Sequence, residues 1–350
     1  MLPNIDVTIL LPFIIAFITT TLATPLCIKL IKKFQILDDP KTHKHPAVIH
    51  KKPIPRGGGV PIFTGILISS LFLLPMTHVT ISLLIAAFIA LLVGILDDKF
   101  DISPYIRFPM NIISALIVVS AGVAVTFITN PFGGILYLNQ IPFLPQIVAA
   151  VWVVWVMNML NWSKGVDGQM PGIVAISGVA IGILSLRFPI IDANSIIAAK
   201  LAFIIAGSSL GFLIFNFYPA KIFPGYSATS IYLLLAAVSI LSSAKLATAI
   251  LVMGVPMMDG IFTVLRRIMS GKSPFWHDKK HLHHLLLSMG FSQRHIALSY
   301  WVFSAILGFL ALILDSRGKL FAIIMLLIIV FGGILFLQYL IKKANGKVNL

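Results

Sequence analysis

Two adjacent aspartates, Asp97 and Asp98, stand at the end of an apolar stretch, and Asp101 follows closely. Neighbouring carboxylates repel each other when both are ionised, so the pair implies a bound cation or strong hydrogen-bond donors nearby. Two solvated loop residues are the plainer interpretation, but a third carboxylate beside an apolar segment fits it poorly. We therefore expect the pair to organise a metal ion or to take a proton from a phosphate nucleophile.

Amide and carboxylate oxygens also gather between Asn158 and Gly168. Asn158 and Asn161 are three residues apart and would share one face of a helix. Such amides can simply join membrane helices, but Asp167-Gly168 adds a carboxylate on a turn where the backbone can approach a ligand. Because Mg²⁺ prefers hard oxygen ligands, the cluster predicts a magnesium site.

Three histidines, His281, His283 and His284, follow a basic segment that includes Arg266 and Arg267. A zinc site made of these histidines alone is disfavoured, because neighbouring side chains diverge on a helix and the chain has one cysteine and no HExxH motif. Imidazoles among lysines and arginines are typical of contacts to phosphate or sugar oxygens. A basic helix at the membrane surface is the alternative.

Arg56 stands before three glycines in the loop over residues 38–59. Its guanidinium could bind phosphate through two hydrogen bonds, beside exposed backbone N–H groups. Taken alone this pattern is weak, because cytoplasmic loops of membrane proteins are also basic.

The overall composition indicates which elements position these clusters. The chain has 350 residues, of which 59% are hydrophobic and 11% charged, and its mean hydropathy is +1.02. A soluble fold cannot bury that much apolar surface, and backbone groups inside a bilayer must be hydrogen-bonded internally. We therefore expect an all-α, polytopic integral membrane protein. The net charge of +15 fits cytoplasmic loops near anionic lipid and does not indicate nucleic-acid binding.

Eleven apolar runs are candidate membrane helices. They lie near residues 8–31, 58–75, 78–96, 108–128, 146–160, 171–186, 195–217, 227–242, 244–265, 296–314 and 320–341. The loops over 32–57 and 266–295 are rich in lysine and arginine, whereas 129–145 has no charge and is predicted to be a small external hairpin. The positive-inside rule then places the N-terminus outside and the C-terminus in the cytoplasm.

This topology brings the polar clusters together at one membrane face. The chain would form a single transmembrane domain over residues 1–350, with cytoplasmic loops near 32–57, 97–107, 158–170, 218–226 and 266–295. A transporter or channel is disfavoured, because its polar residues would lie at mid-membrane depth.

In this order, the clusters resemble the motifs of the polyprenyl-phosphate N-acetylhexosamine-1-phosphate transferases, and the resemblance covers nearly the whole chain. The matching segments are Asp39-Pro40 with Pro55-Arg56-Gly57-Gly58, Asp97-Asp98, Asn158-x-x-Asn161 with Asp167-Gly168, Phe215-Asn216-Phe217 through Phe223, and Asp259 through His284. No single motif is decisive, but the ordered set is specific. Eleven spans resemble the teichoic-acid and O-antigen branch more than the peptidoglycan enzyme.

The resemblance implies a reaction at the cytoplasmic face of the bacterial inner membrane. A UDP-linked N-acetylhexosamine gives its sugar-1-phosphate to undecaprenyl phosphate, UMP leaves, and a cell-envelope glycan such as a lipopolysaccharide or a teichoic acid begins. Mg²⁺, or Mn²⁺ in its place, would offset the charge of the phosphates. The family also leads us to expect a homodimer.

The resemblance also assigns roles to residues. Asp97, Asp98 and Asp167 would be catalytic, and Asn161 and Asp98 would hold the metal ion. The expected substrate-binding residues are Arg56, Asn158, Lys164, Asn216, Lys221, Tyr226, Arg266, Arg267, His281, His283 and His284.

Two positions depart from the family's pattern. Lys164 stands where the family usually has an aspartate, and Tyr226 stands where its metal-binding aspartate is expected. A neutral phenol is a poor ligand for Mg²⁺, because it ionises only at about pH 10. The alternative is therefore a non-catalytic homologue that binds the lipid carrier or the nucleotide sugar.

Overall fold

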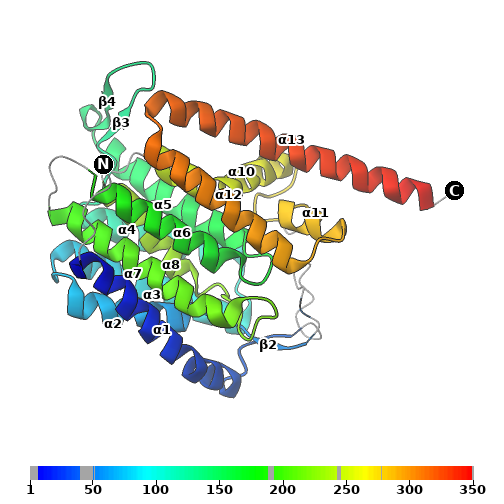
Figure 1. Cartoon of the computed structure of the whole chain (residues 1–350), viewed down its shortest axis with the longest axis horizontal. Coiled ribbons are helices and arrows are strands. Elements are labelled where there is room, and N and C mark those ends of the chain that lie inside the picture. Colours follow the sequence, from blue (N-terminus) through cyan, green and yellow to red (C-terminus); the bar gives the residue numbers. More distant parts are fainter. Residues whose placement is uncertain are drawn as a thin grey trace.

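The computed structural model describes residues 7–39, 50, 52–187, 193–242, 246–276 and 278–348. This part of the chain is a bundle of α-helices that lie side by side with their axes in similar directions (Figure 1). The helices are α1 Val7–Lys33, α2 Gly59–Leu73, α3 His78–Phe100, α4 Pro104–Ser120, α5 Leu144–Trp162, α6 Gln169–Ser185, α7 Ala193–Asn216, α8 Thr229–Leu241, α9 Leu246–Val252, α10 Gly254–Met269, α11 Leu282–Ser288, α12 Gln293–Ile313 and α13 Ser316–Val348. The short elements are β1 Leu37–Asp38, β2 Ile54–Pro55, β3 Phe127–Thr129, β4 Ile135–Tyr137 and the 3₁₀ turn Leu138–Gln140.

Six helices of the described chain are long and apolar enough to cross a membrane: α1, α3, α5, α7, α12 and α13. Four shorter apolar helices, α2, α4, α6 and α8, lie among them. The expected helical, multi-pass architecture is therefore confirmed.

The apolar run predicted over 244–265 corresponds to two helices, which are bent by 90° between α9 and α10. Gly254 and Pro256 follow the break at Met253. Glycine is a weak helix former, and proline lacks the backbone N–H that a continuous helix would need. The run predicted over 108–128 is also shorter than expected, because α4 ends at Ser120 and Gly122 adopts a φ of +93°.

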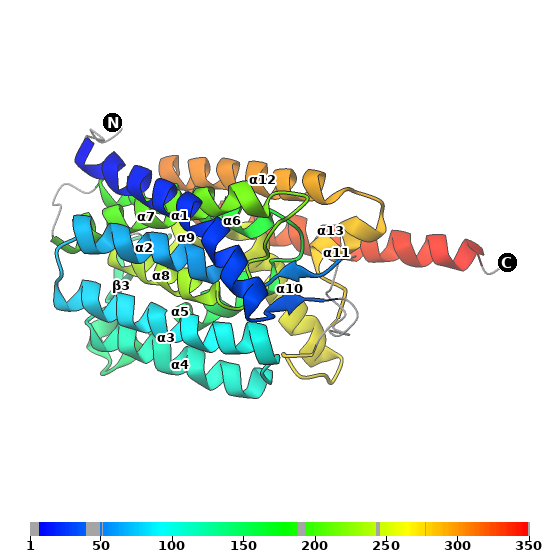
Figure 2. The same ribbon diagram turned by 90° about the horizontal axis from the view of Figure 1, so that it is seen from below.

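The predicted hairpin is present, although it begins slightly earlier than residue 129. Strands β3 and β4 pair antiparallel, with Phe127 opposite Tyr137 and Thr129 opposite Ile135. The hairpin lies at the same end of the bundle as the start of α1, whereas β2, α11 and the C-terminal part of α13 lie at the opposite end (Figure 1). Figure 2 shows the same separation from a second direction.

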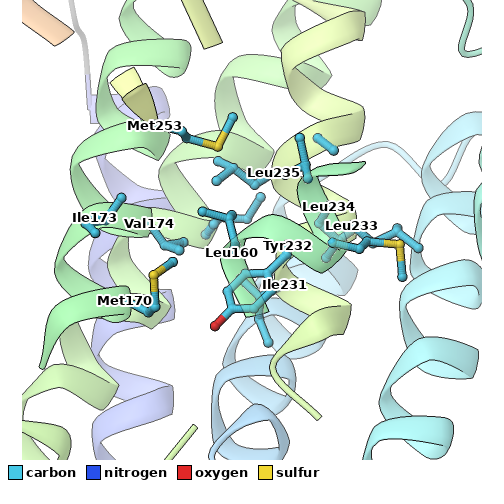
Figure 3. Packing of buried hydrophobic residues seen from close by; sticks show 14 of the residues in the cluster. Leu160, Met170, Ile173, Val174, Ile231, Tyr232, Leu233, Leu234, Leu235 and Met253 are labelled. Carbon is cyan, nitrogen blue, oxygen red and sulfur yellow. The ribbon is translucent and has the colours of Figure 1, made fainter. Parts of the chain in front are cut away.

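Helix α8 forms the centre of the bundle and packs against α3, α5 and α7. Leu233, Leu234 and Leu235 are consecutive and all fully buried, as expected for a helix that is apolar on every side and enclosed by others. Figure 3 shows these leucines among side chains of α5 and α6, such as Leu160 and Met170. The outer helices α1 and α13 instead expose apolar side chains, which suits contact with lipid.

Two glycines let the loop between α7 and α8 press against the end of α3. Gly225 has a φ of +69°, and a side chain there would collide with the carboxylate of Asp98. Gly94 packs directly on the backbone of Ser227, so no Cβ fits there either. These close contacts bring the loop over residues 217–228 onto the paired aspartates.

Candidate functional site

Protein donors surround the paired aspartates at the end of α3. Asp98 accepts hydrogen bonds from Arg56 Nε at 3.0 Å and from the backbone N–H groups of Tyr226 and Ser227. Asp97 accepts from Arg107 Nη1 at 3.0 Å and from Arg56. Both carboxylates are almost completely buried. The strong donors that the sequence required are thus two arginines and two backbone amides.

Asp167 is held in a second ionic cluster. His50 Nε2 lies 2.9 Å from Asp167 Oδ1, and His50 Nδ1 lies 3.0 Å from Asp38 Oδ2. The backbone N–H of Ala220 donates to the other oxygen of Asp167 at 2.9 Å. Burial by itself lowers the pKa of His50, but hydrogen bonds to Asp167 and Asp38 outweigh it and raise the pKa to about 9. His50 is therefore a cation at neutral pH.

The two asparagines at the end of α5 both line the pocket. Asn158 donates from Nδ2 to the backbone oxygen of Val154 at 2.8 Å. Asn161 Oδ1 is buried and has no hydrogen-bond partner among the described residues. Because buried acceptors normally have a partner, this oxygen is available to a ligand.

Asn216, predicted to bind substrate, is instead a structural residue. It accepts from the N–H of Gly168 at 3.0 Å and donates to the backbone oxygen of Ile222 at 2.8 Å. It is fully buried and lies outside the pocket lining. The two hydrogen bonds of its amide join the start of α6 to the loop that follows α7.

Lys164 and Tyr226, the two departures from the family's pattern, lie next to each other. Lys164 Nζ donates to the backbone oxygen of Gly225 at 2.6 Å and lies 5.7 Å from the centre of the Tyr226 ring. Arg107 Cζ lies over the same ring at 4.6 Å, and Asn111 Nδ2 donates to the phenol oxygen at 3.0 Å. Burial, followed by the nearby charge of Arg56, lowers the pKa of Lys164 to about 7.

The histidines of the 266–295 segment form a stacked group. His281 Nδ1 lies 2.8 Å from Asp259 Oδ2, and the His281 and His283 rings stack with their centres 5.6 Å apart. His283 Nδ1 is buried without a hydrogen-bond partner among the described residues. Burial is the main cause that lowers the pKa of His283 well below its usual value and that of His284 to about 4. Those two are therefore neutral hydrogen-bonding groups near pH 7.

Arg266 and Arg267 converge on Asp278. Arg266 Nη2 binds both carboxylate oxygens, at 2.9 and 3.0 Å, and Arg267 Nε binds one of them at 3.1 Å. Burial opposes ionisation of Asp278, but the N–H of Lys280 and then the two arginines lower its pKa to about 2. Arg267 and Asp278 line the pocket, whereas Arg266 does not.

These groups surround a pocket of about 180 Å³. Its lining contains nine of the residues predicted from sequence: Arg56, Asn158, Asn161, Lys164, Tyr226, Arg267, His281, His283 and His284. The other six predicted residues are Asp97, Asp98, Asp167, Asn216, Lys221 and Arg266; none lines the pocket, and Lys221 is exposed. Each of these three aspartates binds a lining residue: Asp98 binds Arg56, Asp97 binds Arg107, and Asp167 binds His50.

Several lining residues were not among the site residues predicted from the sequence. They are Asp38, His50, Asp101, Arg107 and the aromatic residues Trp162, Phe223, Phe275 and Trp276. Arg107 carried a usable signal, because it follows three aspartates within a short segment. His50 carried none, since its basic loop is also what the positive-inside rule predicts.

The residues at this site could hold the expected metal ion only if enough of their carboxylate or imidazole groups were close together and available to it. The described residues contain no group of three or more His, Cys, Asp or Glu side chains that could hold one. The carboxylates of Asp97, Asp98 and Asp167 are already bonded to protein donors, and Tyr226 adds no anionic ligand. The arrangement therefore does not fit an ion held by these carboxylates, and the expected dependence on Mg²⁺ or Mn²⁺ stays a prediction.

The fold and the pocket define a helical membrane protein with a basic, aromatic-lined site at one end of its bundle. Residues 80–243 match the model of glycosyl transferase family 4. Over 358 aligned positions the chain is 29% identical to a Bacillus subtilis protein named as a probable undecaprenyl-phosphate N-acetylglucosaminyl 1-phosphate transferase, covering all of this chain and 95% of that protein.

Two further relatives agree with this match. A decaprenyl-phosphate N-acetylglucosaminephosphotransferase of Mycobacterium leprae is 30% identical, covering 75% of this chain and 73% of that protein. An undecaprenyl-phosphate alpha-N-acetylglucosaminyl 1-phosphate transferase of Thermotoga maritima is 29% identical, covering 91% of this chain and 94% of that protein. The chain belongs to glycosyl transferase family 4.

Proposed function

We propose that this protein transfers N-acetylglucosamine-1-phosphate from its UDP derivative to a polyprenyl phosphate such as undecaprenyl phosphate. The activities for which its relatives are named support the proposal. The observation that carries it is the pocket, where Arg56, Arg107 and Lys164 gather beside aromatic side chains at one end of a membrane bundle. A basic pocket at that position suits a nucleotide diphosphate that meets a lipid phosphate.

In this reaction, an oxygen of the lipid phosphate attacks the phosphorus that bears the sugar. The bond from that phosphorus to the bridging oxygen breaks, UMP leaves with this oxygen, and a lipid-linked diphosphosugar remains. Negative charge grows on the bridging oxygen, so fixed cationic donors near it lower the barrier. Arg56, Arg107 and Lys164 would supply those donors.

The buried aspartates would act mainly by positioning. Asp98 and Asp97 fix the guanidinium groups of Arg56 and Arg107, and Asp167 fixes the imidazole of His50. Asn161 Oδ1 and His283 Nδ1, which have no partner among the described residues, would bind substrate hydroxyl or amide groups. A pocket with orphaned polar atoms is suited to a ligand that satisfies them.

We also propose the finer topology of eleven spans, with the N-terminus outside and the C-terminus in the cytoplasm of an inner membrane. The six long helices, the bent pair and the four shorter helices amount to eleven apolar segments in the described chain. The pocket lies at the end that carries the basic segments, and the positive-inside rule supports the proposal that this end faces the cytoplasm. A homodimer stays a prediction.

Release of UMP tests the proposed function. Purified protein in detergent would be incubated with UDP-N-acetylglucosamine, undecaprenyl phosphate and Mg²⁺, and UMP would be quantified with and without the lipid. We expect release that requires the lipid phosphate. Nucleotide binding with no release would instead support the non-catalytic homologue, the alternative that Tyr226 raises.

A further inference from the structure

The side chain of Tyr226 is a buried aromatic platform for two cations. Arg107 lies over its ring at 4.6 Å, and Lys164 Nζ lies 5.7 Å from the ring centre. Tyr226 is only 4% exposed as a residue, so little water reaches its ring. A cation over an aromatic face is attracted by the ring quadrupole, and the attraction is stronger when water is excluded.

Both side chains have hydrogen-bond donors that the described residues leave unused. Arg107 uses Nη1 on Asp97, whereas its Nε is buried and has no partner among the described residues. Lys164 uses one donor on the backbone oxygen of Gly225, and an ammonium group has three. Both residues line the pocket together with Arg56. Two guanidinium groups therefore meet at one wall with the amine of Lys164, which is partly protonated at neutral pH because its pKa is about 7.

A carboxylate at position 226 would change this wall. Its charge would lie close to Asp97 and Asp98, because the backbone N–H of Tyr226 already donates to Asp98. Three carboxylates together would call for a divalent cation. The phenol ring instead attracts Arg107 and Lys164 without adding charge, and leaves their donors for an anion.

We propose that Tyr226 is a positioning residue whose ring holds Arg107 and Lys164, and that with Arg56 these cations bind the diphosphate of the nucleotide sugar directly, without a divalent cation. The inference rests on the proposed function and deepens it. Guanidinium and ammonium groups are well suited to this task, since charge-assisted hydrogen bonds to phosphate oxygens are short and strong.

The test measures the affinity of the whole purified protein for UDP by titration calorimetry, once in EDTA and once in Mg²⁺. We expect the two dissociation constants to agree within about threefold, because the cations that bind the phosphates belong to the protein. In EDTA, Arg107→Gln and Lys164→Ala should each weaken UDP binding about tenfold or more. Arg294→Gln is the matched control, because Arg294 lies 5.5 Å over the Tyr218 ring but outside the pocket lining.

Substitutions of Tyr226 separate its ring from its hydroxyl group. Tyr226→Phe keeps the ring and should keep the affinity in EDTA, whereas Tyr226→Leu should lose it. Tyr226→Asp should bind UDP well only in Mg²⁺. Tyr218→Leu is the control for loss of a ring elsewhere. If Tyr226→Leu fails to fold, two measurements still decide whether protein cations bind the diphosphate. They are the wild-type affinity for UDP in EDTA and in Mg²⁺, and the affinity of Arg107→Gln in EDTA.

UDP binding by the wild type that is lost in EDTA and restored by Mg²⁺ overturns this inference and leaves the transferase function standing. Equal affinity of wild type and Arg107→Gln in EDTA also overturns it. Absence of UDP binding in both buffers contradicts the proposed function and this inference together.

Discussion

Arg56 Nε lies 3.0 Å from Oδ1 of Asp98, which joins the loop before α2 to the end of α3. The backbone N–H groups of Tyr226 and Ser227 donate to the same carboxylate. Asp98 thus joins its own segment to two others that are far from it in the sequence, the loop before α2 and the loop between α7 and α8. Because these donors come from separate parts of the chain, Asp98 fixes the shape of the pocket wall and the position of Arg56 in it.

Asp98→Asn should abolish transfer of sugar phosphate. Asparagine keeps one acceptor oxygen for the backbone amides but removes the charge that holds Arg56. We expect a loss of about a hundredfold or more in the rate of transfer from radiolabelled UDP-sugar in membranes. Asp315→Asn, which changes an aspartate outside the pocket lining, should retain the wild-type rate. Full activity of Asp98→Asn would remove Asp98 from the mechanism.

Asn161 and Asn216 should respond differently to alanine. Asn161 Oδ1 has no partner among the described residues, so Asn161→Ala should leave thermal stability nearly unchanged and raise the KM for the nucleotide sugar. Asn216→Ala removes two buried hydrogen bonds and should cost about 1–3 kcal/mol of the free energy of unfolding. Equal loss of stability in both variants would contradict the assignment of Asn161 to the substrate.

His50 makes stability depend on pH. Its pKa of about 9 in the folded protein is above its value of about 6.5 in an unfolded chain. The stabilisation is therefore complete below about pH 6.5 and is lost as the pH rises through about 9. Thermal unfolding of wild type and of His50→Gln would be compared from pH 6 to pH 10. We expect the two melting temperatures to converge at the alkaline end, and a gap that widened there would refute the ion pair.

Gly225→Ala should be more harmful than Gly122→Ala. Both glycines have positive φ, +69° and +93°, which costs a non-glycine residue about 1–2 kcal/mol. A Cβ on Gly225 also meets the Asp98 carboxylate, whereas one on Gly122 meets nothing. Thermal unfolding should show the larger loss at Gly225, together with loss of transfer. Equal losses would mean that the loop does not press on Asp98.

Much of the fold could be predicted because hydropathy alone specifies it. Apolar runs became helices, and the clusters around Asp98, Asn161 and His283 came together at one end of the bundle. The short strand pair β1–β2 was not predicted from the sequence, since two residues on each side carry no periodic pattern. The break at Met253 was missed for a related reason, because the apolar run continues through it.

The partners of the site residues could not be predicted, because they come from distant parts of the chain. Asp167 meets His50, which is 117 positions away, and Asn111 meets Tyr226 across 115 positions. The resemblance assigned Asn216 to substrate binding, yet its amide oxygen and nitrogen are both hydrogen-bonded to backbone groups. The residue types indicated which segments carry polar side chains. Tertiary packing decides which of their atoms lack a hydrogen-bond partner in the protein.

The pocket around Arg56, Arg107 and Lys164 is proposed to transfer a sugar phosphate from a nucleotide to a lipid. The most direct measurement is mass spectrometry of undecaprenyl phosphate after incubation with the purified protein and a panel of UDP-sugars. We expect a product whose mass has increased by one N-acetylhexosamine phosphate, and no such product after incubation with Asp98→Asn. Unchanged lipid with every UDP-sugar, from wild-type protein shown to be folded and to bind UDP, would contradict the account.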